Sequence, residues 1–178
     1  MTMRDLQKSA IIAELVKTYR SRGYPCWETH LQKSIYFLQD LLDVPLEFDF
    51  LLYKYGPFSF ELRDHLAAMQ ADEMIVVRPR DLGANFEPGQ QVQYLETRFP
   101  TTIRNHQPFI DWVVDKLGAK GVKDLEPLAT ALYFAKQNPS EDVEHRAQRI
   151  VDAKPHVKPE EARRAVMLVD EWRDSKPL

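Results

Sequence analysis

The second half of the chain is a succession of segments that each carry one apolar stripe at helical spacing, and this pattern constrains the fold most. Helices are predicted over residues 106–117 and 124–136, a further one follows the cap at residues 138–141, and the last opens at residues 159–161. A helix with a single apolar stripe is stable when that stripe is buried. These helices must therefore pack on one another or on the first half.

The first half has a mixed pattern. Helices are predicted over residues 5–21, from a capping box at residues 29–32 to Leu42, and from the N-cap Ser59 to Met69. Residues 46–53 alternate in the manner of a strand, and residues 74–77 and 91–96 look like two more strands joined by a polar loop. This order is close to that of a winged-helix domain, so we expect a three-stranded antiparallel sheet in this half.

The length and composition indicate one domain. A chain of 178 residues with 44% hydrophobic and 29% charged residues suits a single ordered core. We therefore predict an α+β domain over residues 1–178, predominantly helical, with a winged-helix-like part at 1–98 and a helical part at 104–174 packed on it. The polar N-terminus and the absence of a long apolar run predict no membrane span and a cytoplasmic location.

Charge and motif content argue against several function classes. The net charge of −3 gives no overall attraction to phosphate backbones or anionic lipids. A single cysteine, Cys26, excludes an internal disulfide, and the five histidines lack metal-ligand spacing. Glu61 and His65 stand one helical turn apart, which is typical of a surface pair. Nucleotide-binding and hydrolase motifs are also missing, so we predict no cofactor, no metal and no enzymatic activity.

The segment around Tyr55-Gly56-Pro57 has two interpretations. In the simpler one, Gly56 and Pro57 form a sharp corner after the strand, while Tyr53 and Tyr55 pack against the helix that follows residue 29. In the other, an exposed groove is lined by aromatic rings with polar tips, which suit interfaces. The candidate partner-binding set is Tyr36, Tyr53, Lys54, Tyr55, Gly56, Pro57 and Ser59.

Two stretches resemble a known group. The sequence LQKSIYFLQ at residues 31–39, followed by YKYGPFS at residues 53–59, resembles the Panacea superfamily. The sequences DLEPLATALY at residues 124–133 and KPH at residues 154–156 are similar to the YwgA-like branch in particular. In the SocA-like branch the resemblance implies a binding module that neutralises a toxin, in one case by delivering it to a protease, whereas the YwgA-like branch has no settled activity.

We therefore expect a non-enzymatic macromolecule-binding module, antitoxin-like or adaptor-like, whose partner is another protein. The alternative is a winged-helix transcription regulator that inserts its third helix into DNA. The outward positions of that helix include Glu61, Arg63 and Asp64, which suit phosphates poorly, and Arg78 and Arg80 are its best support. A hydrolase with an unrecognised site is a third hypothesis. Trp112 and Trp172 are predicted in the core, and self-association through them is left open.

Overall fold

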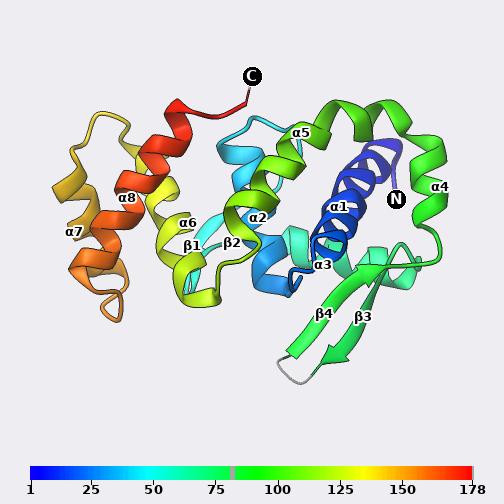
Figure 1. Ribbon diagram of the computed structural model, residues 1–178, viewed down its shortest axis with the longest axis horizontal. Helices are drawn as coiled ribbons and strands as arrows, with labels where there is room; N and C mark the ends of the chain where they lie inside the picture. The colour runs from blue at the N-terminus through cyan, green and yellow to red at the C-terminus, as the bar shows by residue number, and fades with distance from the viewer. Residues whose placement is uncertain (81–82, 178) are drawn as a thin grey trace.

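The computed structural model describes residues 1–80 and 83–177, which fold into eight helices and two separate antiparallel hairpins (Figure 1). The elements are α1 (Met3–Ser21), α2 (Glu28–Asp40), β1 (Leu51–Tyr53), β2 (Gly56–Phe58), α3 (Phe60–Ala71), β3 (Ile75–Arg80), β4 (Gly83–Pro88), α4 (Val92–Arg98), α5 (Pro100–Leu117), α6 (Val122–Gln137), α7 (Val143–Ala153) and α8 (Pro159–Asp174). The prediction of a mostly helical α+β chain is confirmed.

The apolar stripes predicted for the first two helices are buried, but the predicted first residue of the second helix was wrong. Helix α1 begins after Thr2, whose hydroxyl accepts a hydrogen bond from the Asp5 N–H at 3.1 Å. Helix α2 begins at Glu28, one residue before the predicted capping box, and the Trp27 N–H lies 3.4 Å from His30 Nδ1. The capping box was a wrong prediction because the Gln32 amide is used for a tertiary contact instead.

The single three-stranded sheet was also a wrong prediction. Of residues 46–53, only Leu51–Tyr53 pairs, and it pairs with Gly56–Phe58, while Glu47 takes a positive φ of 56° that interrupts an extended run. Strand β4 lies within the predicted loop and pairs with β3. The predicted strand at 91–96 is helix α4, because Val92 and Leu95, three residues apart, are both buried. The described residues thus form two hairpins, and the β3–β4 hairpin projects from the body (Figure 1).

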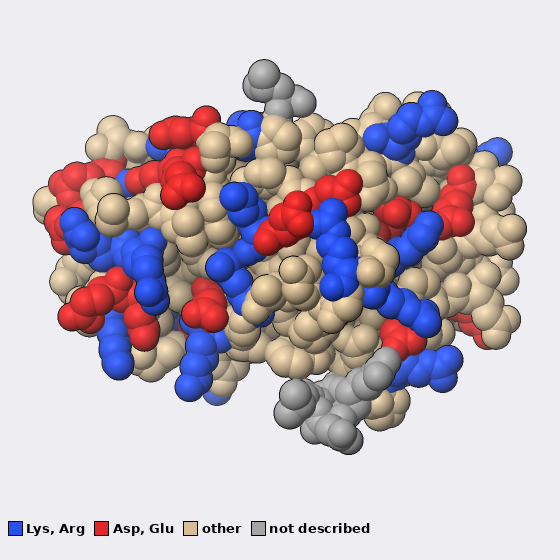
Figure 2. Space-filling view, viewed as in Figure 1, with Lys and Arg blue, Asp and Glu red and all other residues tan. Residues whose placement is uncertain are grey.

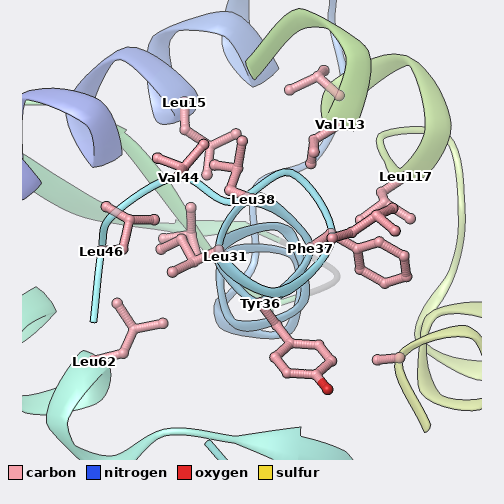
Figure 3. Packing of buried hydrophobic residues seen from close by; sticks show 14 of the residues in the cluster. Leu15, Leu31, Tyr36, Phe37, Leu38, Val44, Leu46, Leu62, Val113 and Leu117 are labelled. Atoms are coloured by element: carbon pink, nitrogen blue, oxygen red, sulfur yellow. The ribbon is translucent and has the colours of Figure 1, made fainter. Parts of the chain in front are cut away.

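The helical second half packs on the first around α2. Figure 3 looks along this helix, with Leu38 pointing toward Leu15 of α1 and Phe37 toward Leu117 of α5. The Phe37 ring also meets Trp172 of α8 at 5.7 Å between centroids. One hydrophobic cluster therefore includes residues of both halves.

The ends of the C-terminal helices differ slightly from the prediction. The cap of α7 is Asp142, whose carboxylate accepts from the His145 N–H at 3.0 Å, and not residues 138–141. Helices α7 and α8 are joined by a pair of hydrogen bonds from Arg146 to Asp170 at 2.7 and 2.5 Å. Trp172 is buried, as predicted, and contacts Trp112. In the described part of the chain, no helix combines the length and apolarity needed to cross a bilayer.

Candidate interaction site at the β1–β2 hairpin

Helix α2 holds the β1–β2 hairpin through two consecutive polar residues. The Gln32 amide donates to the Ser59 carbonyl at 2.9 Å and accepts from the Ser59 N–H at 2.9 Å. The Lys33 ammonium donates to the Pro57 carbonyl at 2.7 Å. Ser59 in turn caps α3, because its hydroxyl accepts from the Leu62 N–H at 3.1 Å. The end of the hairpin and the start of α3 are therefore positioned by one turn of α2.

The C-terminal helices hold the same hairpin from a second direction. Lys154, between α7 and α8, donates to the carbonyls of Tyr53 and Lys54, the latter at 2.6 Å. Its ammonium lies 3.8 Å from Glu126 Oε1 of α6, and His156 Nε2 lies 3.0 Å from Glu126 Oε2. The turn of the hairpin is thus attached to elements that follow it by about 100 positions.

These anchoring groups form a buried ionic cluster, which we define as Lys33, Glu126 and Lys154. Their exposed fractions are 3%, 5% and 5%. Burial lowers the pKa of Lys33 to about 8, against the opposing effect of the Glu126 carboxylate, and burial also lowers the pKa of Lys154. Glu126 Oε1 makes no hydrogen bond within the described residues. Two ammonium groups therefore share one carboxylate, and the buried ionic cluster carries excess positive charge.

Gly56 allows the hairpin to approach α6 closely. Its φ is +83°, a left-handed conformation that strains other residues. A Cβ at this position would lie 3.1 Å from Thr130 Oγ1 and 3.3 Å from the Glu126 carbonyl oxygen. The predicted strand-to-helix corner at Gly56 and Pro57 was wrong, because both residues pair within β2 and the turn between the two strands is formed by Lys54 and Tyr55.

The opposite side of the hairpin exposes apolar and aromatic side chains. Tyr53 and Tyr55 are 52% and 53% exposed, and Leu51 is 45% exposed. The Tyr53 ring meets Phe60 edge-on at 5.5 Å, and Phe60 meets Phe58 at 5.1 Å. We call this surface the aromatic face, made of Leu51, Tyr53, Tyr55, Phe58 and Phe60. Cations border it, because the Lys54 ammonium lies 5.2 Å from the Tyr55 ring and the Arg63 guanidinium 5.0 Å from the Phe60 ring.

The predicted partner-binding set divides into an exposed and a buried part. Tyr53, Lys54 and Tyr55 are exposed. The remainder are buried: Tyr36, Gly56, Pro57 and Ser59. Tyr36 packs against Phe50 at 4.9 Å in the core, so the exposed groove that Tyr36 and Ser59 were predicted to line is not formed. The simpler interpretation is also wrong in one respect, because Tyr53 and Tyr55 point to solvent and not onto α2.

The residues considered for catalysis or metal binding are Cys26, Glu61 and His65. Burial raises the pKa of the Cys26 thiol, and no hydrogen bond joins that thiol to a histidine in the described ranges. Glu61 accepts from the Asp49 N–H at 3.2 Å, while His65 Nε2 lies 3.0 Å from Ser9 Oγ. Among residues 1–80 and 83–177, no cluster of three or more metal-ligating side chains occurs.

The fold brings together one serine and histidine that the sequence did not connect. Ser9 Oγ lies 3.0 Å from His65 Nε2, and it also donates to the Asp5 carbonyl at 2.9 Å. The Ser9 hydroxyl has one proton, so when it donates to the Asp5 carbonyl the His65 ring nitrogen is the donor in their contact. Ser9 is fully buried, which makes this pair a tie between α1 and α3.

The remaining surface shows no continuous basic area on the side that Figure 2 displays, where Lys and Arg alternate with Asp and Glu. An open hollow of about 660 Å³ lies beside α4, but its cations are paired, Lys17 with Glu96 at 2.5 Å and Arg20 with Glu87 at 3.7 Å. On α3, Arg63 is next to Asp64 at 3.7 Å. Of the two arginines that supported DNA binding, Arg78 is exposed, whereas the Arg80 side chain and residues 81–82 of the predicted polar loop lie outside the described part of the chain.

No protein-family model matches this chain, and no curated protein is significantly similar to it. The Panacea-like resemblance therefore stays a prediction. The structure does bring its motif segments together. Gln32 and Lys33, from residues 31–39, contact residues 53–59. Glu126 and Thr130, from residues 124–133, lie next to Gly56. Lys154 and His156, from residues 154–156, contact Glu126. All four segments meet at the β1–β2 hairpin.

Proposed function

We propose that this chain is a non-enzymatic protein-binding module of the cytoplasm, and that the aromatic face is its binding surface. The observation that carries this proposal is the combination of exposed aromatic rings with a hairpin whose backbone is held from beneath. Tyr53 and Tyr55 expose half of their surface while the carbonyls beside them are bound by Lys154. Tyrosine contributes strongly at protein interfaces because it offers a large apolar ring with a polar tip.

The anchoring supports binding for a thermodynamic reason. A flexible loop loses conformational entropy when a partner orders it, and this loss subtracts from the affinity. The hairpin is already ordered by Gln32, Lys33 and Lys154, so little of this entropy remains to be lost. Through the same contacts the buried ionic cluster stabilises the hairpin, since its ammonium groups bind backbone carbonyls and its members are almost fully shielded from solvent.

The Panacea-like motifs favour an adaptor-like or antitoxin-like role within this class. These motifs contain the residues that anchor the hairpin. Such a position is expected if Panacea proteins share a binding surface on this hairpin. The partner would then be another protein, such as a toxin or a client delivered to a protease. The winged-helix transcription regulator is the alternative, and it predicts recovery of DNA in the following experiment.

Capture from native cells with matched variants tests the proposal. Tagged wild-type chain, the double variant Tyr53→Ala/Tyr55→Ala and the control Tyr94→Ala are compared after cross-linking by mass spectrometry. Tyr94 is 49% exposed on α4, so the control removes a similar exposed ring at a different place. We expect one specific protein to be recovered with wild type and control and at least about tenfold less with the double variant. Equal recovery with all three proteins would refute the aromatic face as the binding surface.

A further inference from the structure

The charges that contact the hairpin turn are mostly positive. Lys33 and Lys154 donate to the carbonyls of Pro57, Tyr53 and Lys54. The Lys54 ammonium extends over the Tyr55 ring at 5.2 Å, on the exposed side of the same turn. Within the described residues, the carboxylate that forms an ion pair with one of these three lysines is Glu126, at 3.8 Å from the Lys154 ammonium. Three ammonium groups therefore meet one carboxylate at the turn.

Resting on the proposed function, we propose that the aromatic face binds an acidic segment of its partner protein, an extended stretch with Asp or Glu beside an apolar residue. The apolar side chain would cover Tyr53 and Phe60, and the carboxylates would lie over the turn. Lys54 is exposed and can pair with a carboxylate directly. The field of buried Lys33 and Lys154 is screened less than that of surface charges, so it adds to this attraction.

Charges at the other end of the aromatic face define the orientation of the segment. The start of α3 carries exposed Glu61 and Asp64, with Arg63 beside Asp64 at 3.7 Å. Acidic side chains of a partner would be repelled from this end and attracted to the turn. Nucleic acid would place regularly spaced phosphates over both ends, which makes an acidic polypeptide the better match.

Peptide selection tests the charge of the segment. A displayed library of random peptides about 12 residues long is selected on the immobilised full-length chain. Selected peptides are synthesised with a fluorescent label, and their affinities are measured by anisotropy for wild type, Lys54→Glu and the control Arg104→Glu. Arg104 is exposed on α5 and its reversal changes the net charge equally.

We expect Asp and Glu next to an apolar residue in the selected peptides. Lys54→Glu should weaken their binding at least about tenfold, Arg104→Glu should weaken it less than about twofold, and added salt should weaken the binding to wild type. Selected peptides without acidic enrichment, or equal effects of the two reversals, would overturn the inference.

The variant Tyr53→Ala/Tyr55→Ala separates failure of this inference from failure of the proposed function. Neutral or basic peptides that lose binding to this variant would overturn the acidic segment and leave the aromatic face as the binding surface. A selection that yields no peptide dependent on the two tyrosines would overturn both proposals. Tyrosine-dependent binding of a labelled oligothymidine, measured in parallel, would replace the polypeptide with nucleic acid and would also overturn both.

Discussion

Replacement of Gly56 by alanine should destabilise the fold through two separable effects. The first is backbone strain, because Gly56 has a φ of +83°. The second is steric, because the new Cβ would lie 3.1 Å from Thr130 Oγ1 and 3.3 Å from the Glu126 carbonyl oxygen. Gly23 offers a matched control, since its φ is +72° and a Cβ there would meet nothing within 4 Å. Gly23→Ala therefore reports the backbone effect without the steric one.

The expected magnitudes follow from these two terms. A left-handed conformation costs an alanine about 1–2 kcal/mol, and the smaller entropy of the unfolded alanine chain offsets part of this, so Gly23→Ala should cost about 1 kcal/mol. Overpacking of a tight contact adds about 1–3 kcal/mol, so Gly56→Ala should cost about 2–4 kcal/mol in total. With a typical urea dependence of about 2 kcal/mol per M, the difference of about 1–3 kcal/mol corresponds to a urea midpoint lower by about 0.5–1.5 M.

Equilibrium urea unfolding followed by circular dichroism measures both free energies. A double-mutant cycle with Thr130→Ala identifies the contact, because removing the Thr130 hydroxyl should recover part of the steric cost of Gly56→Ala. The reasoning would be refuted if Gly56→Ala and Gly23→Ala had the same free energy of unfolding, or if Thr130→Ala and Gly56→Ala were strictly additive.

Further expected outcomes concern the buried charges and the thiol. Glu126→Gln should lower the free energy of unfolding by about 3–5 kcal/mol, because it leaves two buried ammonium groups without their carboxylate. The control Glu144→Gln removes one member of an exposed ion pair and should change the free energy of unfolding little. Equal urea midpoints for the two variants would contradict this prediction. The pKa of Lys33 is lowered to about 8 in the folded chain, so the unfolded chain binds more protons above that pH. The free energy of unfolding of wild type relative to that of Lys33→Met should therefore rise from pH 8 to about 10. Parallel pH curves for the two proteins would contradict a lowered pKa of Lys33. Cys26 should react with a thiol reagent only after unfolding, so rapid labelling of the native protein would show that the thiol is accessible.

The helices could be predicted because each carries an apolar stripe that depends on neighbouring positions alone. The stripes of α5, α6 and α8 are buried as expected. The two hairpins could not be predicted in the same way, because the pairing of a strand depends on residues outside that strand. Phe86 lies in a stretch rich in turn-forming residues, yet its N–H donates to the Cys26 carbonyl at 2.8 Å, which stabilises β4 in a region predicted as a loop.

The candidate site was predicted in part. Tyr53, Lys54 and Tyr55 stand in a segment whose glycine and proline mark a turn, and the turn presents them to solvent. The anchors were missed, since Lys33 and Glu126 are ordinary charged residues of amphipathic helices and Lys154 lies in the connection between two such helices. Their function depends on burial, and a lysine in a helix is exposed far more often than buried. The predicted Panacea-like resemblance groups Gln32 and Lys33 with residues 53–59, and this grouping was the signal that the sequence offered for their contact.

Attachment of the hairpin to Lys154 links the order of synthesis to the shape of the finished surface. On the ribosome, the segment Leu51–Phe58 emerges about 100 residues before the lysine that binds its carbonyls. Until then, the carbonyls of Tyr53 and Lys54 lack the ammonium group that binds them in the finished chain. An incompletely translated chain would thus lack one of the two attachments of the proposed binding surface, and a partner that binds this surface should bind finished molecules in preference to nascent ones.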